Sequence, residues 1–329
     1  MCEVTVFMAV YNGSAYLRDA IDSILSQTFK DFELLIINDG STDNSVDIIS
    51  SYTDPRIRLL HNEQNRGLLF TRNRGVQEAR GEYIAILDCD DIAVTDRLET
   101  QYNFLQLHKD IAMCGGHSIY IDENGIPTGY ILKQPTHNIL ANMLFVNPFV
   151  NSTLMIRKSV IEEVGGYRDY APAEDFDLSL RIAQKYEVAN IDAVLVKYRI
   201  HQHNISGTQT DRMVNAEHEI LAQMHEYLGL SKDYEQIAIH HAVYVENYSK
   251  YPLPKYQHFL EYLKNIANKK NTFDTHILNK LVYDKWYEII RSSPSRSVLK
   301  PYFFSDLFYW PAVKWKHLRK IFKQSIGIK

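Results

Sequence analysis

The segment Gly81–Asp91, which reads GEYIAILDCDD, places Asp88, Asp90 and Asp91 directly after an apolar run. Side chains alternate along extended backbone, so Asp88 and Asp90 are expected on one side. Carboxylates this close repel each other, and a bound cation or a raised pKa relieves the repulsion. Oxygen ligands at this density suit Mg²⁺ or Mn²⁺, especially where substrate phosphates complete the shell. The motif therefore indicates a nucleotide-diphosphate site, with a solvated turn or a helix start as the alternative.

Asp39 lies in IINDGSTDNS, at the end of another apolar run. A carboxylate held at a strand end can accept the N3–H of a uracil ring. Turn chemistry is the alternative: Asp39 and Gly40 would make the turn, and Thr42 or Asp43 would cap the next helix. Because the turn accounts for the residues after Asp39 but does not require an acid at this position, the binding role is favoured.

Arg72 and Arg74, in NRGLLFTRNRG, follow the third apolar run. One of them could contact a diphosphate or a base, and a solvated helix face is an equal alternative. The chain has no GxGxxG after its first apolar run and no GxxxxGK[ST], so neither a dinucleotide fold nor a phosphate-binding loop of that kind is indicated.

Glu174 and Asp175 open a predicted helix after the loop GGYRDYAPA. Acids there complement the helix dipole, but Asp175 is also well placed to act as a general base, and the residues alone leave both roles open. His201 and His203 follow a later strand, in KYRIHQHNIS. A loop histidine is usually solvated; as a metal ligand beside aspartate it would favour Mn²⁺ over Mg²⁺.

The elements that position these residues alternate between short apolar runs and amphipathic segments. Repeated β-α-β of this kind predicts a parallel sheet buried on both faces, with ligands bound beyond the carboxyl ends of its strands. Tyr11, Asp39 and Asp88 would therefore meet at one edge. The predicted strands are Val4–Val10, Phe32–Ile37, Ile57–Leu60 and Tyr83–Leu87, and the predicted helices are Tyr16–Ser26, Val46–Ser51 and Leu68–Ala79.

The remaining chain is predicted to continue the α/β pattern and then to become helical. From Asp211 onward the pattern is mostly helical. The elements predicted before that point are strands at Ile111–Ile121, Leu154–Arg157 and Ala193–Ile200, and helices at Lys158–Val164 and Glu174–Tyr186.

Composition is that of a globular chain: 329 residues, 45% hydrophobic and 23% charged. Three scattered cysteines exclude a disulfide framework and a zinc site of paired CxxC spacing, and a reducing compartment fits them best. The first residues lack the pattern of a signal peptide, and no apolar run reaches transmembrane length. We therefore expect a cytoplasmic protein.

Charge is distributed unevenly along the chain. The net charge is −4, yet residues 296–329 carry eight lysines and arginines against the single acid Asp306, a formal charge of +7. An acidic body argues against nucleic acid as a partner, whereas a basic tail with eight aromatics between Tyr302 and Phe322 is suited to an anionic membrane surface. Packing of those aromatics on the protein is the alternative.

Four segments, in the expected order, together resemble family 2 glycosyltransferases, the inverting enzymes of the GT-A fold. They are FMAVYNGSAYLRDAIDSILSQTFKDFELLIINDGSTDNS, NRGLLFTRNRGVQEARGEYIAILDCDD, GGYRDYAPAEDFDLSL and VKYRIHQHNIS. The resemblance covers Val4 to Ser206. It is closest to bacterial lipooligosaccharide and capsule transferases, including the β-1,3-N-acetylglucosaminyltransferase type, through NPFVNSTLMIRKSVI, the AED corner and LVKYRIH.

The resemblance implies a role for each matching residue. Tyr11 and Asp39 would hold the uridine, with Ala9 and Val10 lining its pocket. Asp88 and Asp90 match the family's DxD motif, in which Asp88 would contact the ribose or sugar and Asp90 would bind the metal. Asp175 matches the catalytic base. His201 matches the histidine that closes over the diphosphate. Val150 departs from the histidine frequent in close relatives, which leaves acceptor and donor-sugar specificity open.

The implied organisation is a GT-A catalytic domain over 1–210, with a nucleotide half over about 1–110 and an acceptor half over about 111–210, followed by a helical region over 211–329. The implied reaction is metal-dependent transfer, with Mn²⁺ or Mg²⁺, from a UDP-sugar to a saccharide or glycolipid acceptor. Two rivals remain: a sugar nucleotidyltransferase, although AVYNGSAYL lacks its glycine-rich basic loop, and a non-catalytic sugar-nucleotide-binding protein on the same fold.

Overall fold

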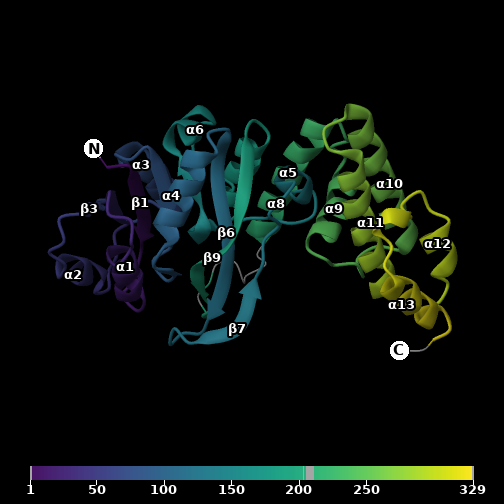
Figure 1. Ribbon diagram of the computed structural model, residues 1–329, viewed down its shortest axis with the longest axis horizontal. Helices are drawn as coiled ribbons and strands as arrows, with labels where there is room; N and C mark the ends of the chain where they lie inside the picture. The colour runs from purple at the N-terminus through teal and green to yellow at the C-terminus, as the bar shows by residue number, and fades with distance from the viewer. Residues whose placement is uncertain (1, 203, 205–210, 328–329) are drawn as a thin grey trace. The chain divides into compact units, whose positions relative to one another are not determined.

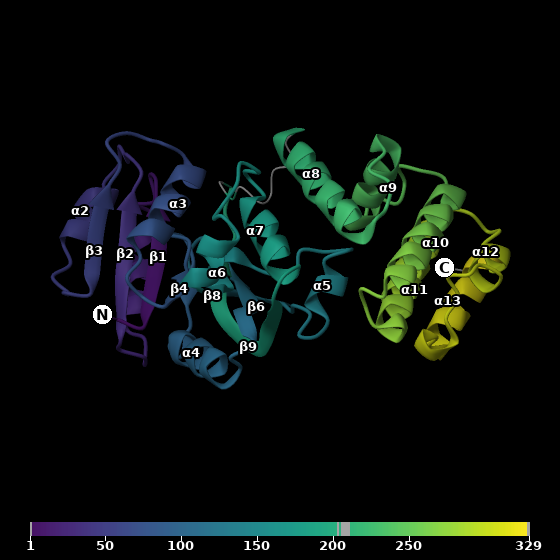
Figure 2. The ribbon, with the colours of Figure 1, turned by 90° about the horizontal axis from the view of Figure 1, so that it is seen from above.

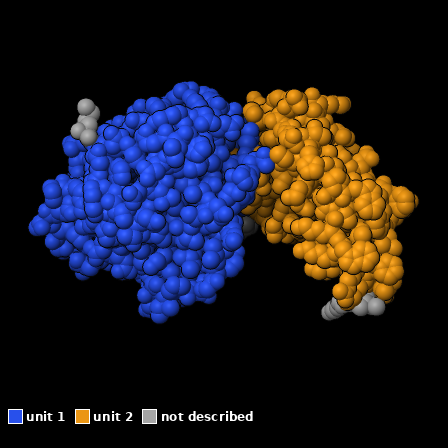
Figure 3. All heavy atoms as spheres, in the orientation of Figure 1, with its two compact units in different colours: residues 1–140, 147–216 blue, residues 141–146, 217–329 orange. Residues whose placement is uncertain are grey.

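The structure, a computed structural model, describes residues 2–202, 204 and 211–327. His203 and Ser206, named above, lie outside the described residues. The chain divides into two compact units, residues 1–140 with 147–216 and residues 141–146 with 217–329 (Figure 3). The first unit is an α/β body and the second is helical, which confirms the predicted fold class.

A single mixed sheet forms the centre of the first unit. Among the described residues it has nine strands in the order β3-β2-β1-β4-β8-β6-β9-β5, with β7 paired to β6. The elements are β1 (Val4–Val10), α1 (Leu17–Leu25), β2 (Phe32–Asn38), α2 (Ser45–Ser50), β3 (Ile57–His61), α3 (Leu68–Glu78), β4 (Tyr83–Ile86), β5 (Ile92–Ala93), α4 (Arg97–Leu107), β6 (Ile111–Ile121), β7 (Pro127–Leu132), the 3₁₀ turn η1 (Asn151–Thr153), β8 (Met155–Arg157), α6 (Lys158–Glu163), α7 (Glu174–Ala183) and β9 (Glu187–Arg199).

Strands β1 to β4 run parallel, as the apolar runs predict (Figure 2). Val4 pairs with Phe32 of β2 on one side and with Tyr83 of β4 on the other, so β1 is central. Beyond β4, the strand β8 is antiparallel and β6 runs parallel to β9. The carboxyl ends of β1, β2 and β4 therefore lie at one edge, where Tyr11, Asp39 and Asp88 follow.

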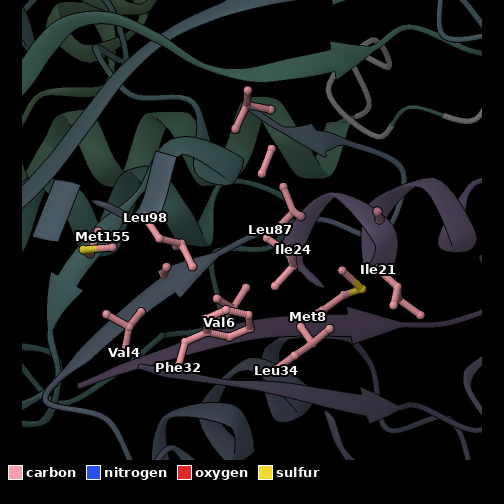
Figure 4. Close-up of a cluster of buried hydrophobic side chains, with 14 of the residues drawn as sticks. Val4, Val6, Met8, Ile21, Ile24, Phe32, Leu34, Leu87, Leu98 and Met155 are labelled. Carbon is pink, nitrogen blue, oxygen red and sulfur yellow. The ribbon is translucent and has the colours of Figure 1, made fainter. Parts of the chain in front are cut away.

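The core of this half follows from the alternation of β1. Val4, Val6 and Met8 join one buried cluster with Ile21 and Ile24 of α1 (Figure 4). Each of these five side chains is fully buried. Burial of one such side chain contributes about 1.5–3 kcal/mol relative to exposure, so the cluster holds α1 against the sheet and places the loop between β1 and α1.

The second unit is built of helices (Figure 1). They pack around buried aromatic and aliphatic side chains. Trp286 and Tyr302 are fully buried there. The helices are α9 (Tyr234–Tyr244), α10 (Leu253–Lys270), α11 (Thr275–Ser292), α12 (Leu299–Phe303), η3 (Trp310–Ala312) and α13 (Trp315–Ser325), while α5 (Ile139–Asn142) and α8 (Asp211–Leu228) span chain positions at which the division falls.

The tail aromatics divide between packing and exposure. Tyr302 is buried and its hydroxyl contacts that of Tyr283, whereas Phe304, Trp310 and Trp315 are exposed. Neither exposure to a membrane surface nor packing on the protein, the two alternatives for this segment, therefore accounts for all of its aromatics. Within the described ranges, none of the helices combines the length and the apolar character that a bilayer span needs.

Candidate active site

A cleft of about 950 Å³ in the first unit brings together nine of the residues proposed for the site from the sequence. The nine residues, Ala9, Val10, Tyr11, Asp39, Arg72, Asp88, Asp90, Asp175 and His201, all line it. They come from the loops after β1, β2 and β4, from α3 and α7, and from the segment after β9. Arg74 is not among the lining residues, because its guanidinium donates to His61 O and Asn62 Oδ1.

Asp39 is almost fully buried and organises the loop between β3 and α3. Its Oδ1 accepts from Asn62 Nδ2 at 2.6 Å and from the backbone N–H of Arg66 at 2.9 Å. Its Oδ2 accepts from the N–H of Gly67 at 2.9 Å. A carboxylate has about four acceptor positions, so one remains for a ligand in the cleft. The acid thus has a structural task, and the sequence offered no sign of it.

Gly40 lets the same two loops approach closely. Its φ of +72° is in the left-handed region, and a Cβ built on it would lie 2.6 Å from the backbone N of Asn65. Any other residue would be strained and would collide with backbone there. Gly40 therefore serves the close contact between the loop after β2 and the loop after β3, in addition to making a turn.

We expect Asp39→Ala to lower the free energy of unfolding by about 2–4 kcal/mol, because three N–H donors lose their acceptor. The affinity for UDP, the nucleotide that the family resemblance implies, is expected to fall as well, since the cleft loses its remaining acceptor position. Urea unfolding followed by circular dichroism measures the first effect. Asp110→Ala, which removes an exposed turn acid, is the matched control and should change stability little. Equal stability of the two variants would mean that Asp39 does not hold the loop.

Asp88 is fixed by two residues of η1. Asn151 Nδ2 lies 3.0 and 3.1 Å from its two carboxylate oxygens, and Ser152 Oγ donates to Oδ2 at 3.0 Å. The same Ser152 oxygen accepts from the N–H of Asp88 at 3.2 Å. Arg72 lies beside this group, with Nη2 3.8 Å from Asp88 Oδ1. Asp88 is thus anchored by protein donors on the cleft wall.

Asp90 faces His201 across the cleft, with His201 Nε2 2.9 Å from Asp90 Oδ2. Burial raises the pKa of Asp90, and the Asp88 carboxylate raises it further, while His201 opposes the rise. The imidazole also packs on the ring of Tyr16, with centroids 5.0 Å apart. Asp90 and His201 are therefore a paired carboxylate and imidazole held in a defined place.

Arg199, the last residue of β9, supports this pair from behind. Its side chain is buried, and Nε donates to the carbonyl of Asp90 at 2.9 Å. Nη1 donates to the carbonyl of Glu123 at 2.9 Å, and Nη2 pairs with Asp19 of α1 at 2.9 Å. The backbone N–H of Arg199 donates to Asp91 Oδ1 at 2.9 Å. One arginine thus ties the acidic loop to α1 and β9.

The donor set suits a divalent cation that a substrate helps to hold. Among the described residues no group of three or more His, Cys, Asp or Glu side chains has the arrangement of a complete metal site. Asp90 supplies one carboxylate oxygen and His201 supplies one imidazole nitrogen, and these two atoms lie 2.9 Å from each other. Two protein ligands leave most positions to water and to phosphate oxygens, and the mixed oxygen and nitrogen set favours Mn²⁺ over Mg²⁺. The residues present therefore fit the cation.

Asp175 lies in the first turn of α7, next to a buried ion pair. Glu174 Oε1 pairs with Nη1 of Arg72, and both side chains are almost completely buried. Burial raises the pKa of Asp175 to about 6; Arg72 opposes this rise, whereas the Glu174 and Asp88 carboxylates add to it. A carboxyl with a pKa near 6 is a better proton acceptor than an ordinary aspartate and is still ionised near neutral pH.

Asn151, Ser152 and Arg199 are the site residues that the sequence reasoning missed. Asn151 and Ser152 stand in the NPFVNS stretch, where they resemble an ordinary polar turn. Arg199 occurs in a strand, where an isolated arginine is normally read as exposed. Each acts through a partner 60 or more positions away in the chain, and single-sequence patterns carry no signal for such contacts.

Comparison with known proteins decides the family. The sequence model of the family described as glycosyl transferase family 2 matches residues 5–165 of this chain. The O-antigen biosynthesis glycosyltransferase WbnJ of Escherichia coli is 38% identical over 207 residues, which cover 60% of this chain and 80% of WbnJ. The chain belongs to glycosyl transferase family 2. It is therefore a glycosyltransferase, and the family resemblance is confirmed.

Other relatives and solved structures agree with this family. The E. coli enzyme named UDP-Glc:alpha-D-GlcNAc-diphosphoundecaprenol beta-1,3-glucosyltransferase WfaP is 30% identical over 212 residues, covering 64% of this chain and 82% of WfaP. TarS of S. aureus, solved with UDP-GlcNAc, superposes with a TM-score of 0.58 at 15% identity, covering 87% of each chain. The mannosyltransferase PcManGT of Pyrobaculum calidifontis, solved with GDP-Man and Mn²⁺, has a TM-score of 0.52 at 15% identity, covering 99% of this chain and 87% of that one. These likenesses confirm the GT-A fold.

Proposed function

We propose that this family 2 glycosyltransferase transfers a hexose or N-acetylhexosamine from a UDP-sugar to a saccharide or glycolipid acceptor, with inversion at the anomeric carbon. The process would be the assembly of lipopolysaccharide, lipooligosaccharide or capsule. The observation that carries the proposal is the meeting of Asp39, Asp88, Asp90, His201 and Asp175 in one cleft. The printed names of WbnJ and WfaP, and the UDP-GlcNAc bound to TarS, support this class of donor and pathway.

The nucleotide half, about residues 1–110, would hold the donor. Asp39 keeps one acceptor position for the uracil N3–H, and Ala9, Val10 and Tyr11 line the same side of the cleft. Asp88, anchored by Asn151 and Ser152, would accept from a hydroxyl of the ribose or sugar. Arg72, held by Glu174 and 3.8 Å from Asp88, places positive charge beside the diphosphate.

Two buried acceptor atoms in the cleft wall are suited to sugar hydroxyls. Asn151 Oδ1 and Glu174 Oε2 have no hydrogen-bond partner among the described residues, and both residues line the cleft. A buried acceptor without a donor is costly, so a ligand rich in hydroxyl groups would be stabilised there. This chemistry favours a sugar over an apolar ligand.

The acceptor half, about residues 111–210, contributes an aromatic wall. Tyr120 of β6 and Tyr198 of β9 line the cleft with ring centroids 5.6 Å apart, and Phe149 and Val150 line it as well. Flat aromatic faces of this kind offer apolar contact to a sugar ring while the hydroxyl groups stay paired with polar groups. Val150, which replaces a histidine frequent in close relatives, adds an apolar contact directly before Asn151.

Asp175 would act as the base. A sugar hydroxyl is a weak nucleophile near neutral pH, so a carboxylate must accept its proton as the new bond forms. Inversion requires the base and the leaving diphosphate on opposite faces of the ring. Asp175 on α7 and Asp90 with His201 would occupy those two sides. A divalent cation bound by Asp90 and His201 would stabilise the charge that develops on the departing UDP.

A donor screen tests the proposal. The purified chain, with Mn²⁺ and a saccharide acceptor, is incubated separately with UDP-GlcNAc, UDP-GalNAc, UDP-Gal and UDP-Glc, and released UDP is measured. We expect release that depends on both donor and acceptor, and a β-linked product by NMR from an α-linked donor. Release of pyrophosphate from a sugar phosphate and UTP would instead indicate a nucleotidyltransferase. UDP-sugar binding without turnover on a broad acceptor panel would indicate a binding protein.

A further inference from the structure

Helix α13 presents an apolar stripe that the second unit does not cover. Trp315, Phe322 and Ile326 are 80%, 58% and 53% exposed. Successive residues of a helix are rotated by about 100°. If α13 is extended by one residue to include Ile326, positions 315, 322 and 326 fall within roughly 40° of one another around the helix axis. The opposite face is buried: His317 and Ile321 pack inside the unit, and Gln324 donates to the carbonyls of Ile290 and Ser293.

A row of cations borders this stripe on one side. Lys316, Arg319 and Lys320 are exposed and Lys323 is partly exposed. By the same rotation they lie between about 40° and 140° from Trp315. Among the described residues no ion pair engages any of the four. Residues 296–329 contain one acid, so the segment itself offers little negative charge to offset these cations.

The segment before α13 adds two exposed aromatics. Phe304 is 85% exposed and Trp310 is 70% exposed. Phe308, between them, packs instead against the buried Tyr302, with ring centroids 5.3 Å apart. The exposed rings are therefore not a consequence of an unfolded tail. They project from a segment whose other aromatics are fixed.

We propose that the α13 surface, defined as Trp315, Phe322 and Ile326 with the row Lys316, Arg319, Lys320 and Lys323, docks on an anionic phospholipid bilayer. Indole and phenyl rings beside lysine and arginine are the composition of helices that lie in the plane of a membrane interface. Each cation near such a surface adds electrostatic attraction. The docking is independent of the sugar-transfer proposal, because it involves no residue of the cleft.

Charge argues against a second copy of the chain as the occupant. A twofold contact through the stripe would be self-complementary, so the cationic row of one protomer would face the cationic row of the other. Like charges so placed repel each other unless acids lie between them, and Asp306 is the only acid in the segment. An anionic lipid surface satisfies both the rings and the cations.

Vesicle co-sedimentation of the full chain tests the proposal. Vesicles of phosphatidylcholine with phosphatidylglycerol are compared with vesicles of phosphatidylcholine alone. We expect binding to the anionic vesicles that weakens with salt. Trp315→Ser with Phe322→Ser should lower the partition coefficient about tenfold or more, because the apolar anchors are lost. Arg319→Glu with Lys320→Glu should do the same through charge.

Matched controls remove equivalent groups elsewhere. Leu107→Ser removes a side chain that is 81% exposed in the first unit, and Lys109→Glu with Lys269→Glu makes the same charge change on other exposed lysines. Both controls should bind vesicles within about twofold of wild type. Equal loss in controls and test variants would overturn a local docking surface. A wild-type dimer that Trp315→Ser with Phe322→Ser converts to monomer, with vesicle binding unchanged, would assign the stripe to self-association.

Discussion

Replacing Asp175 with asparagine is expected to reduce sugar transfer about 10²–10⁴-fold while UDP affinity stays near the wild-type value. The substitution keeps the size and polarity of the side chain, but it replaces a carboxylate, which can accept a proton, with an amide, which cannot. UDP contacts are assigned to Asp39, Asp88 and Asp90, on loops of the sheet edge, so they should survive the change. Transfer assays alongside calorimetry with UDP measure both quantities.

The surroundings of Asp175 explain why the base should sit here and not at its neighbour. Glu174 is held in a buried pair with Arg72 through Oε1, so its carboxylate cannot turn toward an acceptor hydroxyl without breaking that pair. Among the residues that the structure describes, none forms an ion pair with Asp175, and Asp175 lines the cleft. Glu174→Gln should lower stability, because Arg72 would become a buried charge without its partner. It should also weaken sugar binding, because Glu174 Oε2 is one of the two acceptors proposed for sugar hydroxyls.

The pH profile supplies a second readout. Burial raises the pKa of Asp175 to about 6, and only the ionised form can accept the proton. The wild-type kcat/KM should therefore fall as the pH decreases through about 6, and the residual activity of Asp175→Asn should lack that step. Asp47→Asn, in the first turn of α2, is a control for loss of a helix-start acid and should keep the wild-type profile. Near-normal turnover by Asp175→Asn would remove this residue from the mechanism.

Much of the fold is predictable because β1, β2 and β4 are buried on both faces, while the edge strand β3 is partly exposed. Continuous apolar runs mark β1 to β4, and Val4–Val10 matches its strand at both ends. The elements that lacked such a signal include β7 and α4. Strand β7 is exposed along most of its length, so no alternation of apolar and polar residues develops. Helix α4 buries the polar side chains of Arg97 and Gln101, which bond to distant backbone carbonyls, and its apolar periodicity is weak as a result.

The site residues also divide into those that a local sequence pattern predicts and those that depend on contacts between distant segments. Acids after buried strands follow a local rule, because parallel strands end at a common edge, and Asp39, Asp88 and Asp90 do line one cleft. What holds them depends on long-range pairing. Asn151 reaches Asp88 only because β8, which follows η1, pairs with β4, and Arg199 reaches Asp90 only because β9 runs beside β5. The order of the later strands is not encoded in any local pattern.

Asp90→Ala should reduce transfer about 10²–10³-fold, and Mn²⁺ should not restore it. The variant removes the carboxylate oxygen that lies 2.9 Å from His201 Nε2, which is one of the two ligands proposed for the cation. In wild type, EDTA should abolish transfer, and Mn²⁺ should restore it more fully than Mg²⁺ because imidazole favours Mn²⁺. Full turnover of wild type in EDTA would contradict metal dependence.

Binding separates this effect from a general loss of structure. Wild type should bind UDP more tightly with Mn²⁺ than in EDTA, and Asp90→Ala should bind it equally weakly in both conditions. Asp96→Ala, which removes an exposed acid from the same loop region, is the matched control and should keep the Mn²⁺ response. Arg199 holds the Asp90 carbonyl and not its carboxylate, so the backbone of Asp90→Ala should stay in place. A normal Mn²⁺ response in Asp90→Ala would move the cation away from this residue, and Asp88 would then be the carboxylate to test.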